Sequence, residues 1–511
     1  MATVELAVSE KAPAVISAAL LCDLLLFLLI SCLILFPCFW QHHIEAGDLG
    51  SHVYNAWLAE LIGQGKAPGL YLVTQWNNVL FDLLLLNFAK MVGFLAAEKL
   101  ATSLCVLVFF WGVFLLMKAV SGPPPWFLAP CIAMLAYGHI FHLGFMNYYL
   151  SVGLACIGLS LLWDGRRNGL KVALLLAPVI LLAHPTGFAL FVSVGVYRLL
   201  WRALPKWNWL LPVVAVGACA AGHWYLYWLH RSVDEVQWRE TPLWQVTGLQ
   251  QFQVFGSRYV IITTAISFLA IASTVAAAWG ATDRARFWKD RRMALELYIV
   301  SFVAVALVPE NLHFDPTGGW IGEIATRLTL VVAIFGLCWL ASLPPQRWYL
   351  AAWAVVALVF FVLIYRDTAF LNRMEANAEA LTRALPFGTR ALATIHLPPD
   401  SSIPFVHIAD RACVGHCFLF SNYEPSTRQF RIRVRPGSPV VTTSVDDSDD
   451  MQSGLYDVQD EDLPLKQIYQ CDGLDLTQIC IRDLAADEKN GRIGYNPFPT
   501  PPTVLDNLTS P

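Results

Sequence analysis

Long apolar runs recur along the chain up to about residue 365 and then stop. The runs at 14–37 and 100–119 are long enough to cross a bilayer, which takes about 20 residues of helix. The remainder is polar, with an acidic stretch, VDDSDDMQSGLYDVQDED, and a Pro-rich end, NPFPTPP. The pattern predicts a mainly α-helical membrane domain over 1–365 and a small soluble α/β domain over 366–511.

Composition supports a membrane protein. The chain is 57% hydrophobic and only 14% charged, which is too apolar for one soluble core of this size. Its net charge is −4 and it has no Lys/Arg tract, which argues against nucleic acid as a partner. The first apolar run lacks a small-residue cleavage site, so we expect a retained helix rather than a signal peptide.

Positive charge marks the loops expected on the cytoplasmic side. Three short loops contain, in order, Arg166, Arg167 and Lys171; Arg198, Arg202 and Lys206; and Arg284, Arg286, Lys289, Arg291 and Arg292. The segments between them, expected on the outer side, are 138–149, 183–187, 229–258 and 309–327. This alternation predicts about eleven crossings, with the loop 41–76 and the C-terminal domain outside. The run 79–95 contains Asp82, Asn87 and Lys90, so we expect it at the outer interface or dipping in and returning.

Four of the 12 cysteines lie in the C-terminal domain, as Cys413 with Cys417 and Cys471 with Cys480. An even number in a soluble domain indicates disulfides formed in an oxidising compartment. A zinc site is the alternative, although the close CxxC pairs of most structural zinc sites are missing. The preferred interpretation is two disulfides between neighbours, on the outer side of the membrane.

The first outer loop, HHIEAGDLGSHVYNAWLAELIGQGKAPGLYLVTQWNN, concentrates polar residues after an apolar span. In a helix that begins near Asp48, Asp48 and His52 share one face and Val53 and Trp57 belong to an apolar stripe. The pattern predicts an amphipathic juxtamembrane helix on the membrane surface. Asp48 also suits the N-cap of that helix, and local geometry leaves both roles open.

The stretch GDLGSHVYNAWLAELIGQGKAP (47–68) resembles the GT-C superfamily of polytopic membrane glycosyltransferases. The resemblance implies transfer of a hexosyl or pentosyl group from a polyprenyl-phosphate donor to a hydroxyl of a glycan, lipid or protein acceptor. In bacterial members this happens on the periplasmic side of the inner membrane. By position Asp48 takes the role of the catalytic acid of the family, and Glu45 is a second candidate. Whether a divalent cation such as Mg²⁺ or Mn²⁺ takes part is open; if one does, Glu45 and Asp48 are its expected ligands.

Three further segments extend the resemblance: HLGFMNYYLSVGL, LLAHPTGFAL and GGWIGEIATRLTLVVAIF. The last contains Arg327, where an outer loop enters an apolar helix, so its guanidinium is expected to grip the donor phosphate. The alternative is an arginine that extends to the interface without a ligand. Asp48 would accept the proton of the attacking hydroxyl as general base.

Other polar residues on the expected outer face are candidates for binding donor phosphate or an ion: His52, His142, His184 and His313. Each has a structural alternative, since an interfacial histidine is often only hydrogen-bonded. Asn147 is a candidate substrate contact or, more simply, the cap of the helix that follows it.

Two other classes of function remain open. Many apolar helices with scattered polar groups also suit a transporter or flippase of a lipid-linked or amphiphilic substrate. Transporters usually have two similar halves, which this sequence does not show, and its polar residues gather at one face. A non-catalytic scaffold that keeps the GT-C-like helices is the third possibility.

Overall fold

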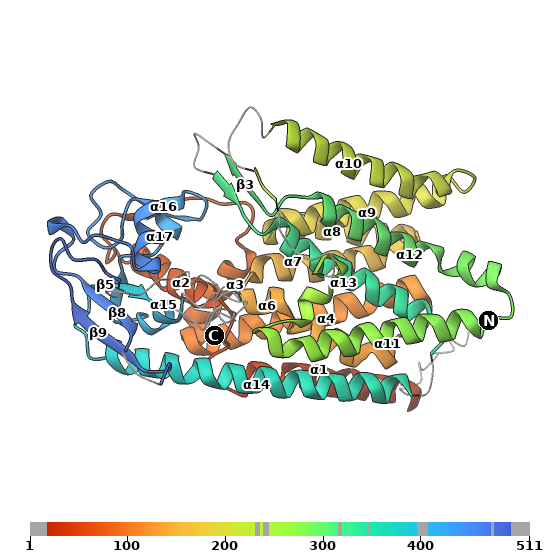
Figure 1. The fold of residues 1–511 in the computed structure, drawn as a ribbon, viewed down its shortest axis with the longest axis horizontal. Coiled ribbons are helices and arrows are strands. Elements are labelled where there is room, and N and C mark those ends of the chain that lie inside the picture. Colours follow the sequence, from red (N-terminus) through yellow and green to blue (C-terminus); the bar gives the residue numbers. More distant parts are fainter. Residues whose placement is uncertain are drawn as a thin grey trace, which may run out of the picture.

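The computed structural model describes residues 18–229, 236–238, 245–314, 319–345, 348–395, 407–471 and 475–491, and it is mainly helical. Long helices lie side by side in an elongated bundle, and the C-terminal domain covers one end (Figure 1). Seven helical segments in the described part of the chain are long and apolar enough to cross a membrane: Phe94–Ser121, Trp126–Leu143, Met146–Trp163, Asn208–Trp228, Ser257–Trp279, Ile324–Ser342 and Tyr349–Thr382. Helices long and apolar enough to cross a membrane are therefore present, and the number of about eleven crossings stays a prediction.

These segments correspond to α4 (Phe94–Ser121), α5 (Ala129–Ala136) with α6 (His139–Leu143), α7 (Met146–Trp163), α10 (Leu211–Leu229), α11 (Val260–Trp279), α13 (Ile324–Ser342) and α14 (Tyr349–Thr382). The other long helices are α1 (Ala18–Leu35), α8 (Arg167–Ala183), α9 (Pro185–Ala203) and α12 (Arg284–Leu307). Helix α3 (Leu80–Val92) has 13 residues, fewer than a crossing needs.

The centre of the bundle is a close contact between α4 and α7. A Cβ on Gly112 would lie 2.3 Å from the carbonyl oxygen of Gly153, so the two backbones approach at a distance that only glycine permits. One turn away, the rings of Phe109 and Tyr149 stack with centroids 4.4 Å apart. This rigid pair supports the short helix α6, which immediately precedes α7.

The two ends of the bundle differ in composition. The Arg-rich start of α12 lies at the end farthest from the C-terminal domain (Figure 1). Asp283 accepts a hydrogen bond from the backbone N–H of Arg286 and so begins α12 there. The first loop and the C-terminal domain share the opposite end. This separation agrees with the charge pattern, and which end faces the cytoplasm remains a prediction from those charges.

The first loop does not lie on the membrane surface as predicted. Most of α2 (Leu49–Gly63) is buried, including Val53 and Trp57, because the C-terminal domain covers it. Strand β1 (Leu70–Leu72) then pairs antiparallel with β7 (Ile432–Val434) of the C-terminal domain. The amphipathic pattern of α2 therefore arises from burial between two layers of protein.

The C-terminal domain contains a four-stranded sheet in the order β6-β5-β8-β9. Strand β5 (Thr389–Thr394) is parallel to β6 (Cys417–Leu419) and β8 (Lys466–Gln470), and β9 (Ile479–Asp483) is antiparallel to β8. Helices α15 (Ile408–Ala412), α16 (Glu424–Thr427) and α17 (Val445–Ser453) complete it. A small second sheet joins β2 (Val236–Gln237), β3 (Asn311–Phe314) and β4 (Gly319–Ile321).

Helix α14 connects the two parts without a break at residue 365. It leaves the bundle and runs along the C-terminal domain to Thr382, after which the chain enters β5 (Figure 1). The sequence NRMEANAEALTRALPFGTRALATI predicts this order of helix and strand, which is confirmed. The last turns of α14 therefore carry polar side chains into the region beside the first loop.

Both disulfide predictions are confirmed. Cys413 pairs with Cys417 between α15 and β6, and Cys471 pairs with Cys480 between β8 and β9. The zinc alternative for these four cysteines is therefore wrong. Disulfides in this domain are compatible with an extracytoplasmic location.

Candidate functional site

Helix α2 is held between the bundle and the C-terminal domain by polar side chains on one of its faces. Ser51 Oγ donates a hydrogen bond to Glu424 Oε1 at 3.1 Å. One turn later, Asn55 Oδ1 accepts one from Asn422 Nδ2 at 2.9 Å. Positions four apart share a helix face, so these contacts fix the rotation of α2 about its axis.

The backbone just before α2 is held by α6. Gly47 N–H donates to the carbonyl oxygen of His142 at 2.7 Å, and Asp48 N–H donates to that of Leu143 at 2.9 Å. Gly144 follows with φ +85°, and a Cβ there would lie 2.3 Å from the Asp48 nitrogen. Only glycine is compatible with both the conformation and the space. The HLGFMNYY segment thus positions Asp48.

The Asp48 carboxylate does not cap α2, which was one of the two roles left open by the sequence. Asp48 occupies the N-cap position of α2, but its side chain makes no capping hydrogen bond. The side chain is 32% exposed, and its Oδ1 lies 3.7 Å from Nε2 of His407. It is therefore a preorganised, solvent-accessible carboxylate beside an imidazole.

His407 comes from the C-terminal domain and joins two carboxylates. Its Nδ1 lies 3.0 Å from Oδ2 of Asp410, on the side opposite Asp48. Burial alone would lower the pKa of His407, but Asp410 and then Asp48 outweigh it and raise the pKa to about 9. At neutral pH the imidazole is positively charged, so it can orient the Asp48 carboxylate.

His52 and Asn147 belong to a hydrogen-bonded chain around Asp82. His52 Nδ1 lies 2.7 Å from Asp82 Oδ1, and Asn147 Nδ2 donates to Asp82 Oδ2 at 2.8 Å. Asn147 Oδ1 accepts a hydrogen bond from the N–H of Phe81, in the first turn of α3. The predicted cap of the helix that follows Asn147 is not formed, because α7 already begins at Met146. Burial lowers the pKa of His52, but Asp82 outweighs it and brings that pKa to about 9. Burial raises the pKa of Asp82, but the His52 charge lowers it below its usual value.

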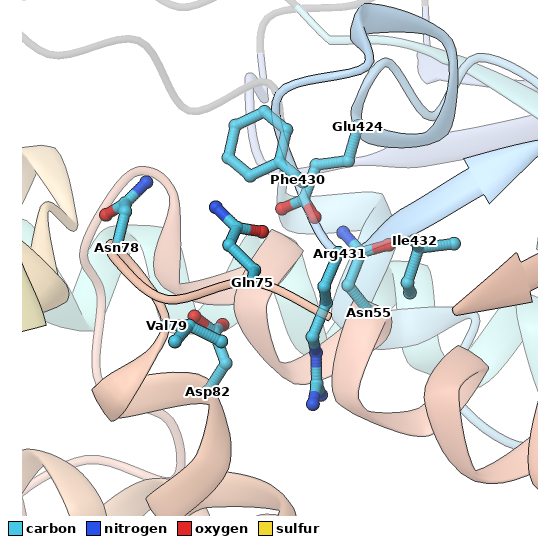
Figure 2. Close-up of a pocket in the computed structure, with 9 residues that line it drawn as sticks. All are labelled: Asn55, Gln75, Asn78, Val79, Asp82, Glu424, Phe430, Arg431 and Ile432. Atoms are coloured by element: carbon cyan, nitrogen blue, oxygen red, sulfur yellow. The ribbon is translucent and has the colours of Figure 1, made fainter. Parts of the chain in front are cut away.

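A narrow pocket with a cavity volume of about 10 Å³ lies between α2, the start of α3 and the C-terminal domain. Figure 2 shows the side chains that line it: Asn55, Gln75, Asn78, Val79, Asp82, Glu424, Phe430, Arg431 and Ile432. Burial raises the pKa of Glu424 to about 8. A carboxyl group that titrates near neutral pH in a pocket is suited to proton transfer.

Arg327 lies at the start of α13, at the same end of the bundle. Its guanidinium carbon is 4.4 Å from the centroid of the Phe145 ring, and Nη1 donates to the carbonyl oxygen of Gly322 at 2.5 Å. Its buried Nε has no hydrogen-bond partner in the described part of the chain. Asp48 is within electrostatic reach. The guanidinium is thus held on an aromatic face with one buried N–H that has no partner among the described residues, which differs from an arginine that extends into solvent at the interface.

Two of the three remaining predicted histidines, His142 and His184, have structural contacts. His142 Nδ1 donates to the carbonyl oxygen of Glu45 at 2.8 Å. His184 precedes α9 and accepts a hydrogen bond from Thr186 N–H at 3.1 Å, and burial followed by the nearby Arg327 lowers its pKa to about 3. His313 belongs to β3, but its side chain lies outside the described part of the structure. These contacts give His142 and His184 roles in holding the loops.

Glu45 points away from Asp48, into a buried cluster around Arg411. Its Oε1 accepts from Asn372 Nδ2 at 2.7 Å, and its Oε2 lies 3.8 Å from Arg411 Nη2. Arg411 also pairs with Glu98 at 2.7 Å and with Glu375 at 2.5 Å. Burial raises the pKa of Glu45 well above its usual value, and the charge of the neighbouring Glu375 acts in the same direction. Glu45 therefore has partners separate from those of Asp48, and the geometry supports neither the catalytic role nor the shared metal ion predicted for it.

Sequence reasoning missed the contribution of the C-terminal domain. His407, Arg411 and Glu424 contact the first loop, and Asp410 pairs with His407. One signal was present: His407, Asp410 and Arg411 interrupt an otherwise apolar segment, IPFVHIADRACVGHCFLF (403–420). Charged residues in such a run are buried with partners or functional. No family model, curated protein or solved structure matches this chain.

Proposed function

We propose that the protein is an integral-membrane glycosyltransferase that moves a sugar from a polyprenyl-phosphate donor to a hydroxyl acceptor on the outer face of the membrane. The observation that carries the proposal is the state of Asp48, whose backbone is fixed by α6 while its carboxylate is uncapped and accessible beside His407. A rigid carboxylate without a structural task, at the end of a membrane bundle, suits a general base for an interfacial substrate.

The reaction assigns a task to each charge. The acceptor oxygen attacks the anomeric carbon of the donor and forms the new glycosidic bond, while its proton passes to Asp48. The bond between the anomeric carbon and the phosphate oxygen breaks, and the phosphate leaves with the electron pair. Arg327 stabilises the charge that develops on that phosphate, using the Nε that has no partner within the described residues.

The two substrates approach from different sides in this proposal. The lipid donor lies along the membrane helices and reaches Arg327 at the start of α13. The acceptor enters beside the C-terminal domain, where the pocket with Glu424 and Arg431 offers polar contacts (Figure 2). Asp48 lies at the start of α2, between these elements, within electrostatic reach of both Arg327 and His52.

The test uses the full-length protein in nanodiscs with a panel of radiolabelled polyprenyl-phosphate sugars and membrane extract as the source of acceptor. We expect Asp48→Asn to reduce transfer by roughly 10²- to 10⁴-fold and to keep donor affinity. Glu60→Gln is the matched control, because Glu60 is a partly exposed acid near the other end of the same helix, and its carboxylate accepts a hydrogen bond from Gln64. Transfer by Asp48→Asn at the parent rate, or no transfer from any donor by the parent protein, would contradict the proposal.

A further inference from the structure

Three side chains with metal-binding atoms meet where the first loop begins. They are His42, His43 and Glu379, and their ligand atoms all lie within 4.8 Å of one another. His43 Nε2 is 2.8 Å from Glu379 Oε1, and the rings of His42 and His43 contact edge to face with centroids 4.5 Å apart. Glu379 comes from the last turns of α14, so the trio joins two segments far apart in sequence.

We propose that His42, His43 and Glu379 bind a divalent transition-metal ion of the zinc type, with water completing the coordination. Two imidazoles and one carboxylate are a common zinc ligand set, with bonds of about 2.0 to 2.2 Å. Tetrahedral ligands are then roughly 3.4 Å apart, which small side-chain rotations achieve from the present arrangement. Imidazole nitrogen favours zinc or copper over magnesium, and this distinguishes the site from one built of carboxylates alone.

A second observation concerns two buried atoms beside the trio. Within the described residues, neither Nδ1 of His43 nor Oε2 of Glu98 has a hydrogen-bond partner, although the two atoms face each other at 3.8 Å. His43 is only 6% exposed and Glu98 is fully buried. When Nε2 of a histidine binds a metal ion, its Nδ1 carries the proton and usually donates it to a carboxylate or carbonyl. A metal ion on His43 would thus give both atoms a partner.

The charge of the surrounding cluster also favours a cation. Three carboxyl groups, those of Glu45, Glu98 and Glu375, surround the guanidinium of Arg411, while Glu379 pairs with His43 and Arg383. A dication bound by the trio would place positive charge beside these buried carboxyl groups. The ion would fasten the start of the first loop to α14, five residues before Asp48.

The test uses full-length protein without a histidine tag, treated with chelator and then titrated with Zn²⁺ by calorimetry and with Co²⁺ by visible absorption. We expect one Zn²⁺ per chain, Co²⁺ bands typical of low coordination with nitrogen ligands, and a higher thermal unfolding midpoint with metal. His42→Ala and Glu379→Gln should each weaken binding at least tenfold and abolish the shift of the midpoint. His416→Ala, which removes a histidine outside the trio, should behave as the parent.

Because His42 is exposed, its replacement leaves the buried cluster intact and the variant should fold. Glu98→Gln should weaken Zn²⁺ binding by roughly 10- to 100-fold through the orientation of His43. Absence of stoichiometric Zn²⁺ binding by the parent, or binding that is unchanged in both His42→Ala and Glu379→Gln, would overturn the site. Metal binding and the unfolding midpoint are both measured without sugar transfer, so the metal site can be disproved without affecting the proposed function, and the reverse is also true.

Discussion

Nε2 of His407, in the C-terminal domain, lies 3.7 Å from Oδ1 of Asp48, at the start of α2. The backbones are also in contact, since a Cβ on Gly50 would lie 2.3 Å from the carbonyl oxygen of His407. The conformation of the first loop therefore depends on the C-terminal domain. A candidate site that local sequence assigns to one loop is completed by a residue from the far end of the chain.

The first prediction is for His407→Gln, which keeps a polar side chain and removes the positive charge. The pKa of His407 is about 9, so the parent holds Asp48 with a cation below that pH and loses it above. We expect transfer by the parent to fall as pH rises through about 9. The variant should be roughly 10- to 100-fold slower at neutral pH and lack that fall, because the base is less well positioned.

His52→Gln is the control, because the pKa of His52 is also about 9 while its imidazole binds Asp82 rather than Asp48. A pH profile of transfer, with donor affinity measured at each pH, separates the two histidines. A fall near pH 9 that persists in His407→Gln and vanishes in His52→Gln would assign the effect to His52.

The second prediction is for Gly144→Ala. The new Cβ would meet the Asp48 nitrogen at 2.3 Å, so the loop must move. Gly415→Ala is a matched control, because Gly415 has the same φ of +85° with nothing within 4 Å. Both variants should lose about 1 to 2 kcal/mol of unfolding free energy from the left-handed backbone. Only Gly144→Ala should also lose transfer, and equal activity of the two would mean that the loop tolerates the shift.

The membrane helices could be predicted because twenty-residue apolar runs and clustered Arg residues are local signals. The disulfides could also be predicted, because Cys413 and Cys417 are near neighbours in sequence. The placement of α2 could not, since a stripe of apolar residues looks the same whether it faces lipid or protein. Trp57 is buried against the C-terminal domain, where it contacts Phe418.

The candidate site was predicted only in part, for a similar reason. Asp48 and Arg327 stand beside recognisable segments, whereas the role of Glu45 depends on Arg411, whose position no local pattern specifies. In the sequence, Asp82 indicates only that the run 79–95 is unsuited to a simple membrane crossing. In the structure it holds His52 and Asn147. Pairings between residues so far apart become visible only in three dimensions.

The third prediction concerns pH and stability through His52 and Asp82. The pKa of His52 rises from 6.5 to about 9 in the folded protein, so its stabilisation is complete below about pH 6.5 and disappears as pH rises through about 9. The pKa of Asp82 is lowered, so its contribution is present above its ordinary pKa of 3.8 and disappears at lower pH. The thermal unfolding midpoint should therefore fall on both sides of this window.

Asp82→Asn tests the same pair directly. Removing one partner of a buried ion pair leaves the other without compensation, so we expect a loss of about 3 kcal/mol in unfolding free energy near pH 7. The variant should also show a smaller decrease in the midpoint between pH 6.5 and 9, since its histidine is no longer held in the charged form. A variant as stable as the parent, with the same pH dependence, would show that the pair is energetically neutral.

The fourth prediction separates the two disulfides. Replacing Cys471 and Cys480 by Ser opens a nine-residue loop and should cost about 3 kcal/mol, while replacing Cys413 and Cys417 opens a four-residue loop and should cost about 2 kcal/mol. Hydrogen exchange of the C-terminal domain in the full-length protein measures the loss of stability in each variant. Only the variant without Cys413 and Cys417 should also have lower transfer activity, because Cys413 directly follows α15, which contains Asp410 and Arg411.

The last prediction concerns Arg327, which is expected to bind the donor phosphate where Asp48 is expected to accept a proton. Arg327→Ala should reduce donor affinity and transfer together, whereas Asp48→Asn should reduce transfer alone. Arg327→Lys should recover only part of the affinity, because an ammonium lacks the planar fork and the Nε that lies unpaired among the described residues. Arg258→Ala is the control, since Arg258 is a half-exposed arginine paired with Asp367. Equal donor affinity in Arg327→Ala and the parent, measured by direct binding of labelled polyprenyl phosphate, would reduce Arg327 to a structural contact with Phe145.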